Sequence, residues 1–248
     1  ENEVTKTEAL WIFDRGDRSI IGTYHAEPLK HNYQENLVDI CPVGAFTSKR
    51  FRFKQRVGFL KERKAICPGC FTGCSISVHA KPEMKRYYRV KPEVNAEVNG
   101  HWMCDAGRGT ISHLNLENRL GRASIRENAA PQKHKEQTTA EAVLHLAQVL
   151  QASDKTKIGL LVSPQYTNEE YESLLGFFVG DLGVRKVFQW REATETRVSF
   201  DGILYRGDHN ANTEGLKQAL EKFKLAAEVK NQFAEFQDLE LDCAIILA

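Results

Sequence analysis

Four cysteines, three of them within eight residues, constrain this chain more than any other feature of its sequence. Two residues separate Cys67 from Cys70, three separate Cys70 from Cys74, and 29 separate Cys74 from Cys104. A cubane iron–sulfur cluster needs four thiolates around a compact core, and one tight loop can supply three of them. The spacing therefore predicts a [4Fe–4S] cluster whose fourth ligand returns from a separate turn at Cys104.

The loop also contains two glycines that would let it curl around a cluster. Gly69 and Gly73 lie between the clustered cysteines, and glycine adopts positive φ without steric cost. Backbone N–H groups of such a loop can point at cluster sulfurs and stabilise their negative charge.

Spacing alone leaves other uses of the four cysteines open. A structural zinc also takes four thiolates, although zinc sites usually come as two separated C-x-x-C knuckles. The thiols could instead be unliganded or oxidised. Thioredoxin-like redox chemistry fits poorly, because it needs a strand–helix context around its C-x-x-C motif.

Composition is that of a globular chain without a membrane segment. Hydrophobic residues make up 42% of the 248 residues and charged residues 27%, as in ordinary domains. No apolar run approaches the roughly 20 residues of a membrane helix. No secretion signal is visible, so the clustered cysteines favour metal binding over disulfides. The chain starts at Glu1 without Met and stops in an apolar stretch, which suggests a piece of a longer protein.

Charge is balanced overall but not locally. A net charge of +1 gives no reason to expect nucleic-acid binding. Residues 49–64, however, hold eight basic residues against the single acid Glu62. This stretch is interpreted either as a solvated connecting helix or as a docking face for an acidic neighbouring subunit.

The first half of the chain predicts short strands and turns. Residues 19–24 form a strand candidate after a turn signal at residues 13–18. Residues 75–79 alternate polar and apolar side chains, as a half-buried strand does. Residues 87–90 form a further strand candidate, with Pro82 and Pro92 expected as the flanking turns.

The second half predicts alternating helices and strands. Capping boxes at Thr138 and Thr167 open two helices, the first with an apolar stripe that we expect to face a core. A helix is also expected over residues 213–229. Strand patterns at residues 157–163, 186–190 and 241–248 alternate with these helices, which indicates a mainly parallel sheet.

Several motifs follow one another in a distinctive order. They are Phe13-Asp14-Arg15-Gly16-Asp17-Arg18, Ile21-Gly22-Thr23, Asn36-Leu37-Val38-Asp39-Ile40-Cys41-Pro42-Val43-Gly44-Ala45-Phe46-Thr47-Ser48-Lys49, Phe51-Arg52-Phe53-Lys54, and Cys67 to Cys74. In this order they resemble a known family, the large iron–sulfur subunit (G-type or 75-kDa) of NADH-quinone oxidoreductase, respiratory complex I. The resemblance is dense over residues 9–108 and only architectural beyond.

The resemblance implies electron transfer through iron–sulfur clusters. Cys67, Cys70, Cys74 and Cys104 match the ligands of one [4Fe–4S] cluster of that family. Cys41 matches the fourth ligand of a second cluster, whose other three ligands lie upstream and are absent here. That second cluster is thus expected only in the full-length subunit.

The first cluster motif is shared with molybdopterin oxidoreductases, and the resemblance implies four parts. They are the tail of a ferredoxin-like domain (1–60), a [4Fe–4S] subdomain of molybdopterin oxidoreductase type (61–120), a linker (121–139) and a partial α/β domain (140–248). The fold class is α/β with a small β-rich iron–sulfur subdomain, followed by the start of a molybdopterin-oxidoreductase-like parallel-sheet region. Molybdopterin enzymes often carry a relay Lys where this chain has Ala106, so no molybdopterin is expected.

Function and partners follow as expectations from the same resemblance. The chain would act as a subunit of NADH:quinone oxidoreductase without being catalytic alone. Partners would be other peripheral-arm subunits, namely the flavin- and NADH-binding subunit and neighbouring iron–sulfur subunits. The complex would lie on the inner face of a bacterial cell membrane, with no direct insertion of this chain. The alternatives are a fragment of a molybdopterin oxidoreductase such as formate dehydrogenase, and a zinc-holding structural or interaction module.

The sequence also predicts roles for a few single residues. Trp102 and Met103 are expected to cover the cluster and keep water away. His79 and His101 are interpreted as surface or structural histidines, because four thiolates already close the site. Arg108 could pair with cluster charge or pack locally, and Cys243 is expected to be an inert buried thiol.

Overall fold

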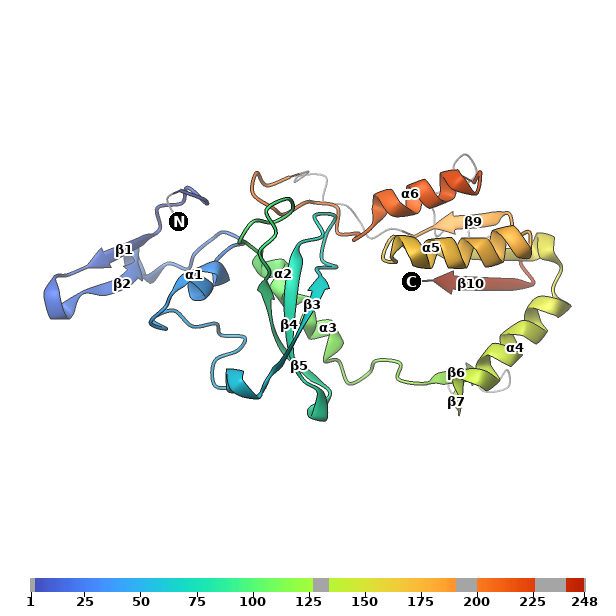
Figure 1. Ribbon diagram of the computed structural model, residues 1–248, viewed down its shortest axis with the longest axis horizontal. Coiled ribbons are helices and arrows are strands. Elements are labelled where there is room, and N and C mark those ends of the chain that lie inside the picture. The colour runs from blue at the N-terminus through green and yellow to red at the C-terminus, as the bar shows by residue number, and fades with distance from the viewer. Residues whose placement is uncertain (1–2, 127–133, 191–199, 226–239, 248) are drawn as a thin grey trace. The chain divides into compact units, whose positions relative to one another are not determined.

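The computed structural model describes residues 3–126, 134–190, 200–225 and 240–247, which fall into two compact units (Figure 1). Unit 1 contains residues 3–115 together with residues 200–209, and unit 2 contains the other described residues. The first stretch of unit 1 ends at Asn115, and residues 200–209 belong to the same unit. The chain therefore returns to unit 1 after entering unit 2.

Unit 1 begins with a hairpin. β1 (Leu10–Phe13) pairs antiparallel with β2 (Ile20–Thr23) across the short helix η1 (Gly16–Arg18). Gly16 has φ +62°, which confirms the predicted turn and the strand that follows it. The hairpin leads through η2 (Tyr24–Ala26) to α1 (Glu35–Ile40), a short helix that ends immediately before Cys41.

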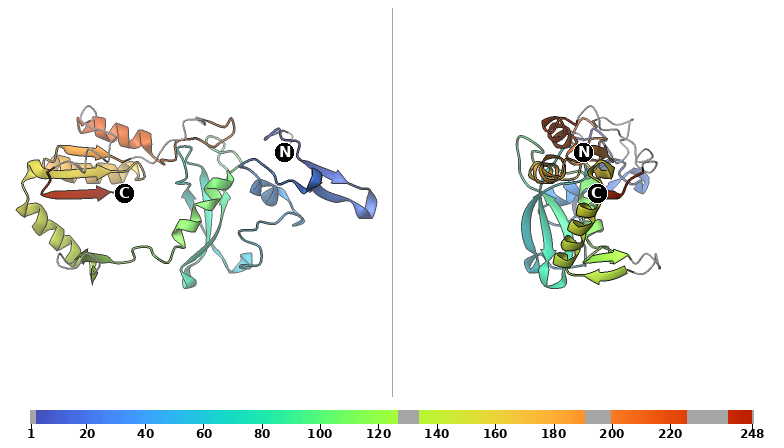
Figure 2. Two further views of the ribbon diagram at one scale, coloured as in Figure 1. Left: turned by 180° about the vertical axis from the view of Figure 1, so that it is seen from behind. Right: turned by 90° about the vertical axis from the view of Figure 1, so that its right-hand side faces the viewer.

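The centre of unit 1 is a three-stranded antiparallel sheet in the order β3-β4-β5 (Figures 1 and 2). Its strands are β3 (Lys61–Ile66), β4 (Ser75–Lys81) and β5 (Arg86–Pro92), and η4 (Pro82–Met84) joins the last two. The strands predicted at residues 75–79 and 87–90 are confirmed. Pro92 is not a turn but the last residue of β5, opposite Ile76. α2 (Asp105–Gly109) and α3 (Ile111–Leu114) follow and pack beside β5.

The expectation that residues 49–64 form a connecting helix is wrong. The stretch contains turns, the short helix η3 (Val57–Phe59) and the beginning of β3. Every residue of β3 is exposed, and among the described strands it pairs with β4 alone. Charged residues are well suited to such an edge strand, because lysine and arginine discourage pairing with other chains.

Unit 2 begins with paired strands inside the stretch expected to be a linker. β6 (Ala123–Arg126) pairs antiparallel with β7 (His134–Gln137), as the right-hand view of Figure 2 shows. α4 (Thr139–Ala152) follows directly. Its first turn carries the predicted capping box, since the Thr138 hydroxyl accepts from the Glu141 N–H and the Glu141 carboxylate accepts from the Thr138 N–H.

The core of unit 2 is a three-stranded parallel sheet in the order β10-β8-β9. The strands are β8 (Ile158–Val162), β9 (Lys186–Gln189) and β10 (Cys243–Leu247), and η5 (Lys155–Lys157) precedes β8. α5 (Asn168–Leu175), continued by η6 (Gly176–Asp181), begins at the predicted capping box of Thr167. The parallel arrangement predicted from the alternation is confirmed.

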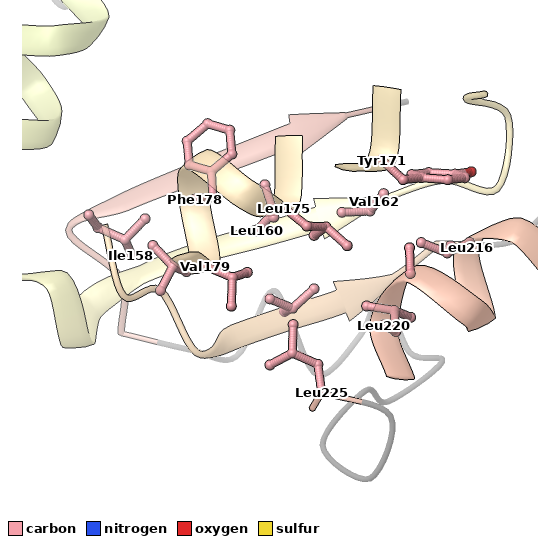
Figure 3. Packing of buried hydrophobic residues seen from close by; sticks show 13 residues of the cluster. Ile158, Leu160, Val162, Tyr171, Leu175, Phe178, Val179, Leu216, Leu220 and Leu225 are labelled. Atoms are coloured by element: carbon pink, nitrogen blue, oxygen red, sulfur yellow. The ribbon is translucent and has the colours of Figure 1, made fainter. Parts of the chain in front are cut away.

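One hydrophobic cluster joins this sheet to its helices (Figure 3). Ile158, Leu160 and Val162 of β8 pack in one cluster with Tyr171 and Leu175 of α5, and α6 (Thr213–Lys222) adds Leu216 and Leu220. The predicted helix at residues 213–229 is confirmed to Lys222, and residues 226–229 lie outside the described part. A Cβ at Gly215 would lie 2.1 Å from Asn168 Oδ1, so the close approach of α5 and α6 explains a glycine in that helix.

The apolar stripe of α4 does not face a core as expected. None of its residues is buried, and Val143 and Leu144 are 59% and 65% exposed. Only Leu150 packs against the cluster of unit 2. Periodicity locates the apolar face of a helix, but what covers that face is decided by the tertiary arrangement. In the described part of the chain, no helix is long and apolar enough to cross a membrane.

Candidate metal centre

The four clustered cysteines surround one small cavity in unit 1. Each is at most 6% exposed, and all four line the same cavity. Three come from the loop between β3 and β4, which closes on itself because the Cys67 N–H donates to the Cys74 carbonyl over 2.9 Å. Gly73 has φ +62°, the positive value that the curl of this loop requires.

The fourth cysteine stands at the beginning of α2. Cys104 is the N-cap residue of this helix, and its sulfur accepts a hydrogen bond from the Gly107 N–H over 3.3 Å. A second backbone donor, the Gly69 N–H, points at the Cys67 sulfur. Backbone N–H groups therefore face two of the four sulfurs, as the stabilisation of thiolate ligands requires.

Gly107 shows how closely the loop and the helix approach. A Cβ at this position would lie 3.0 Å from the Cys67 sulfur and 3.4 Å from the Cys104 sulfur. Such a methyl group would occupy the space that the sulfurs face, and only glycine leaves that space free. The residues present therefore fit a group bound between the sulfurs.

Burial and mutual repulsion keep the thiols of Cys74 and Cys104 protonated in the metal-free chain. Burial raises the pKa of Cys74 to about 12, and the neighbouring sulfurs of Cys67 and Cys104 add to the shift. Burial likewise raises the pKa of Cys104 to about 11. A cationic metal centre would reverse this balance, because thiolates are the metal ligands and metal binding releases their protons.

The arrangement does not suit a single metal ion. Among the described residues, no group of three or more His, Cys, Asp or Glu side chains is placed to hold one ion. A tetrahedral zinc site with Zn–S bonds of about 2.3 Å would bring its sulfurs to roughly 3.8 Å from one another. A cubane spreads its four thiolates over four different irons. A cluster thus tolerates wider separations between its four sulfurs than a zinc ion does.

Apolar side chains exclude water from the cavity. Met103 is completely buried and lines it, as expected from the sequence, whereas Trp102 is partly buried and packs beside the same cluster of residues. Leu204 and Tyr205 also line the cavity. Sequence reasoning missed these two, because nothing local in residues 200–209 points to a partner more than 90 residues away.

Polar contacts join the segment around Cys104 to α1. The Asp105 carboxylate accepts from the N–H groups of Gln34 and Glu35 over 2.8 and 2.9 Å. Asn36 is buried, and its side-chain amide bonds both the carbonyl and the N–H of Met103. These contacts tie residues 34–36 to residues 103–105, across the domain boundary expected near residue 60.

Arg108 pairs with two side chains of α1 that lie 69 and 72 positions earlier in the chain. Its guanidinium is 3% exposed and forms an ion pair with Asp39 over 2.6 Å and a hydrogen bond with Asn36 over 2.9 Å. Lys91 is the second cation beside Asp39, at 3.3 Å.

Cys41 does not line the cavity of the other four cysteines. It caps the end of α1, where the N–H groups of residues 43–46, that of Phe46 above all, lower the pKa of its thiol. Cys243 lies on β10, is only partly buried, and has a pKa raised by burial. His79 is buried, as a structural histidine would be, and pairs with Ser77, whereas His101 is exposed.

Two family models match the chain. The model for the ferredoxin-like domain of NADH-quinone oxidoreductase subunit 3 matches residues 1–47. The model for the Fe4S4 domain of molybdopterin oxidoreductases matches residues 60–116. The first match contains Cys41, and the second contains all four cysteines of the cavity.

Known relatives extend the similarity to most of the chain. It is 26% identical to NADPH-Fe(3+) oxidoreductase subunit alpha of Geobacter sulfurreducens over 97% of its own length and 30% of the relative. It is 30% identical to the G-type subunit of NADH-quinone oxidoreductase from Streptomyces coelicolor over 68% of its length and 20% of the relative. It is 32% identical to NADH-quinone oxidoreductase subunit 3 of Thermus thermophilus, again over 68% of its length and 21% of the relative. The chain thus spans between a fifth and a third of the length of these relatives.

Proposed function

We propose that this chain, a homologue of the large iron–sulfur subunits of NADH-quinone oxidoreductase, carries electrons through one [4Fe–4S] cluster held by Cys67, Cys70, Cys74 and Cys104. The observation that supports this most is the convergence of four buried cysteines on one cavity. They lie within the stretch that matches an Fe4S4 domain. When bound, such a cluster takes up and releases one electron at a time.

Each surrounding residue has a physical task at this site. The four thiolates hold the irons, and the Gly107 and Gly69 N–H groups donate to two of the sulfurs. These donors stabilise negative charge that increases on reduction. Met103 and Leu204 keep water out of the cavity, which lowers the local dielectric and tunes the potential.

The longer protein would supply the remaining parts. Cys41 would complete a second cluster with three upstream ligands, and the lowered pKa of its thiol suits a metal-binding thiolate. Residues 140–248 would begin the α/β region of molybdopterin oxidoreductase type, without molybdopterin because Ala106 replaces the relay lysine. Flavin- and NADH-binding and neighbouring iron–sulfur subunits would be its partners, in a complex on the inner face of a bacterial cell membrane.

A second candidate differs in the electron donor and in the final electron acceptor. The relative named NADPH-Fe(3+) oxidoreductase subunit alpha aligns with 97% of this chain, whereas NADH-quinone oxidoreductase relatives align with 64% to 83%. The near-complete match with that relative is the observation behind an iron-reducing complex as the second candidate. Assaying the purified complex with a quinone and with ferric citrate as alternative acceptors separates the two candidates.

Anaerobic reconstitution with iron and sulfide tests the cluster itself. We expect about four irons per chain, a broad visible absorption and an electron paramagnetic resonance signal after reduction. The Cys104→Ser variant should lose most of the iron, and Cys243→Ser, which lies outside the cavity, should retain it. A colourless chain that binds only zinc would refute the proposal, and molybdenum with pterin in the intact protein would favour the molybdopterin alternative.

A further inference from the structure

A segment from a distant part of the sequence covers the cysteine cavity. Residues 200–209, here called the strap, belong to unit 1, although the described residues that precede them (134–190) and those that follow from Asn210 belong to unit 2. Leu204 is 7% exposed and packs with Cys67, Cys74 and Cys104 in one cluster of buried side chains. Leu204 and Tyr205 line the cavity itself. The strap therefore supplies part of the wall that separates the four sulfurs from water.

Tyr33 holds the strap by hydrogen bonds of its hydroxyl group. The Tyr33 oxygen accepts from the N–H groups of Leu204 and Tyr205 over 3.1 and 3.0 Å. The same hydroxyl donates to the Asp201 carboxylate over 2.5 Å. Burial, together with the hydrogen bond to Asp201, raises the pKa of Tyr33, so this group remains a donor throughout the neutral range.

Asp201 shapes the turn that Tyr33 holds. Its other carboxylate oxygen accepts from the N–H groups of Ile203, Leu204 and Tyr205 over 2.9 to 3.0 Å. One carboxylate thus organises the strap internally and attaches it to Tyr33. Because Tyr33 is only 6% exposed, these bonds are shielded from competing water.

The cysteine loop itself forms the second attachment. The Thr72 hydroxyl donates to the Leu204 carbonyl, and the Phe71 N–H donates to the Asp208 carbonyl over 3.0 Å. Both donors lie between Cys70 and Cys74. The strap is therefore bonded directly to the loop that presents three of the four sulfurs.

We propose that the strap is a fixed cover of the cluster and that Tyr33 is the positioning residue that keeps it closed. This inference rests on the proposed function, because it assigns a role toward a bound cluster. Cluster potential and resistance to oxidation depend on solvent exposure. The Tyr33 hydroxyl bonds Asp201, Leu204 and Tyr205 of the strap, so its hydrogen bonds act on the site through the strap.

The Tyr33→Phe variant tests the hydrogen bonds of the Tyr33 hydroxyl with a minimal change. It keeps the buried ring and removes three hydrogen bonds, each of modest net strength. In the reconstituted chain we expect loss of visible absorption in the presence of a chelator and air to become roughly tenfold faster. The midpoint potential should move to a more positive value, because water would stabilise the more negatively charged reduced cluster. Amide hydrogen exchange at Leu204 and Tyr205 should accelerate by a similar factor.

Two further variants make the result interpretable. Tyr24→Phe removes a hydroxyl from a tyrosine that is 69% exposed and should leave the decay rate, the potential and the exchange unchanged. Thr72→Val removes the second attachment and should accelerate decay in the same direction, which provides a test should Tyr33→Phe not fold.

The outcomes separate this inference from the proposed function. A wild-type chain that takes up no iron overturns both. A wild-type chain that binds a cluster, with Tyr33→Phe and Thr72→Val equal to it in decay rate and amide exchange, overturns the role of the strap and leaves the cluster in place.

Discussion

Arg108 and Asp39 form an ion pair of 2.6 Å between two short helices that each adjoin a cysteine expected to bind iron. Asp39 lies on α1, which ends just before Cys41, and Arg108 lies on α2, which begins just after Cys104. The guanidinium is 3% exposed and the carboxylate 18%. The pair therefore joins the helix that ends before Cys41 to the helix that begins after Cys104.

Removal of one partner of this pair should be costly. Arg108→Met removes the buried partner of Asp39 and leaves Lys91, at 3.3 Å, as the cation beside its carboxylate, so we expect a loss of about 2–3 kcal/mol, below the about 3–5 kcal/mol of an uncompensated buried charge. We expect the thermal unfolding midpoint of unit 1 to fall by about 10 °C, as measured by circular dichroism. The control Arg122→Met breaks a pair whose side chains are 75% and 67% exposed and should cost less than about 1 kcal/mol. Equal effects of the two substitutions would contradict a structural role of the buried pair.

Gly107→Ala should prevent cluster assembly while the fold remains. The new methyl group would lie 3.0 Å from the Cys67 sulfur and 3.1 Å from the Met103 methyl carbon, in the space that a cluster needs. We expect the iron content after reconstitution to fall to a small fraction of the wild-type value, with an unchanged circular dichroism spectrum. Gly58→Ala, where a Cβ meets nothing within 4 Å, is the matched control. Full iron content in Gly107→Ala would show that the cluster does not occupy this space.

The thiols of the metal-free chain should react in a defined order. Backbone N–H groups lower the pKa of Cys41, whereas burial raises that of Cys104 to about 11 and that of Cys74 to about 12. The thiolate is the reactive form, so iodoacetamide should modify Cys41 first at about pH 7.5. Cys74 and Cys104 should react appreciably only as the pH rises toward about 11. Peptide mass spectrometry after timed quenching measures this order, and faster labelling of Cys74 than of Cys41 would contradict it.

His79 should make the chain sensitive to acid. Burial is the main cause of a lowered pKa of this imidazole, and the positive charge of Arg89 lowers the pKa further. The unfolded chain binds a proton near about pH 6.5 and the folded chain resists it, so stability is complete above that pH and falls as the pH drops. We expect His79→Gln to lose less thermal stability than wild type between about pH 7.5 and 5.5. His101→Gln, at an exposed position, should behave like wild type, and an identical pH slope in all three chains would exclude His79 as the source.

Features that depend on near neighbours along the chain could be predicted from the residues alone. The spacing of Cys67, Cys70 and Cys74 predicts a curled loop, because glycine and short separations restrict what the backbone can do. The capping boxes at Thr138 and Thr167 locate two helix starts within a residue. The apolar pattern of residues 157–163 predicts a buried strand of a mainly parallel sheet, and the structure places β8 between β10 and β9.

The meeting of distant segments, by contrast, depends on the folded arrangement. Nothing near Leu204 indicates that it packs on Cys67, or that Tyr33 holds it in place from 171 positions away. Arg108 had two plausible partners until the fold brought Asp39 to it. Residues 61–64 form an edge strand instead of a helix because β4 offers them hydrogen bonds. Local preferences amount to a fraction of a kcal/mol per residue, whereas a buried contact contributes considerably more, so the packing of remote segments prevails wherever the two compete.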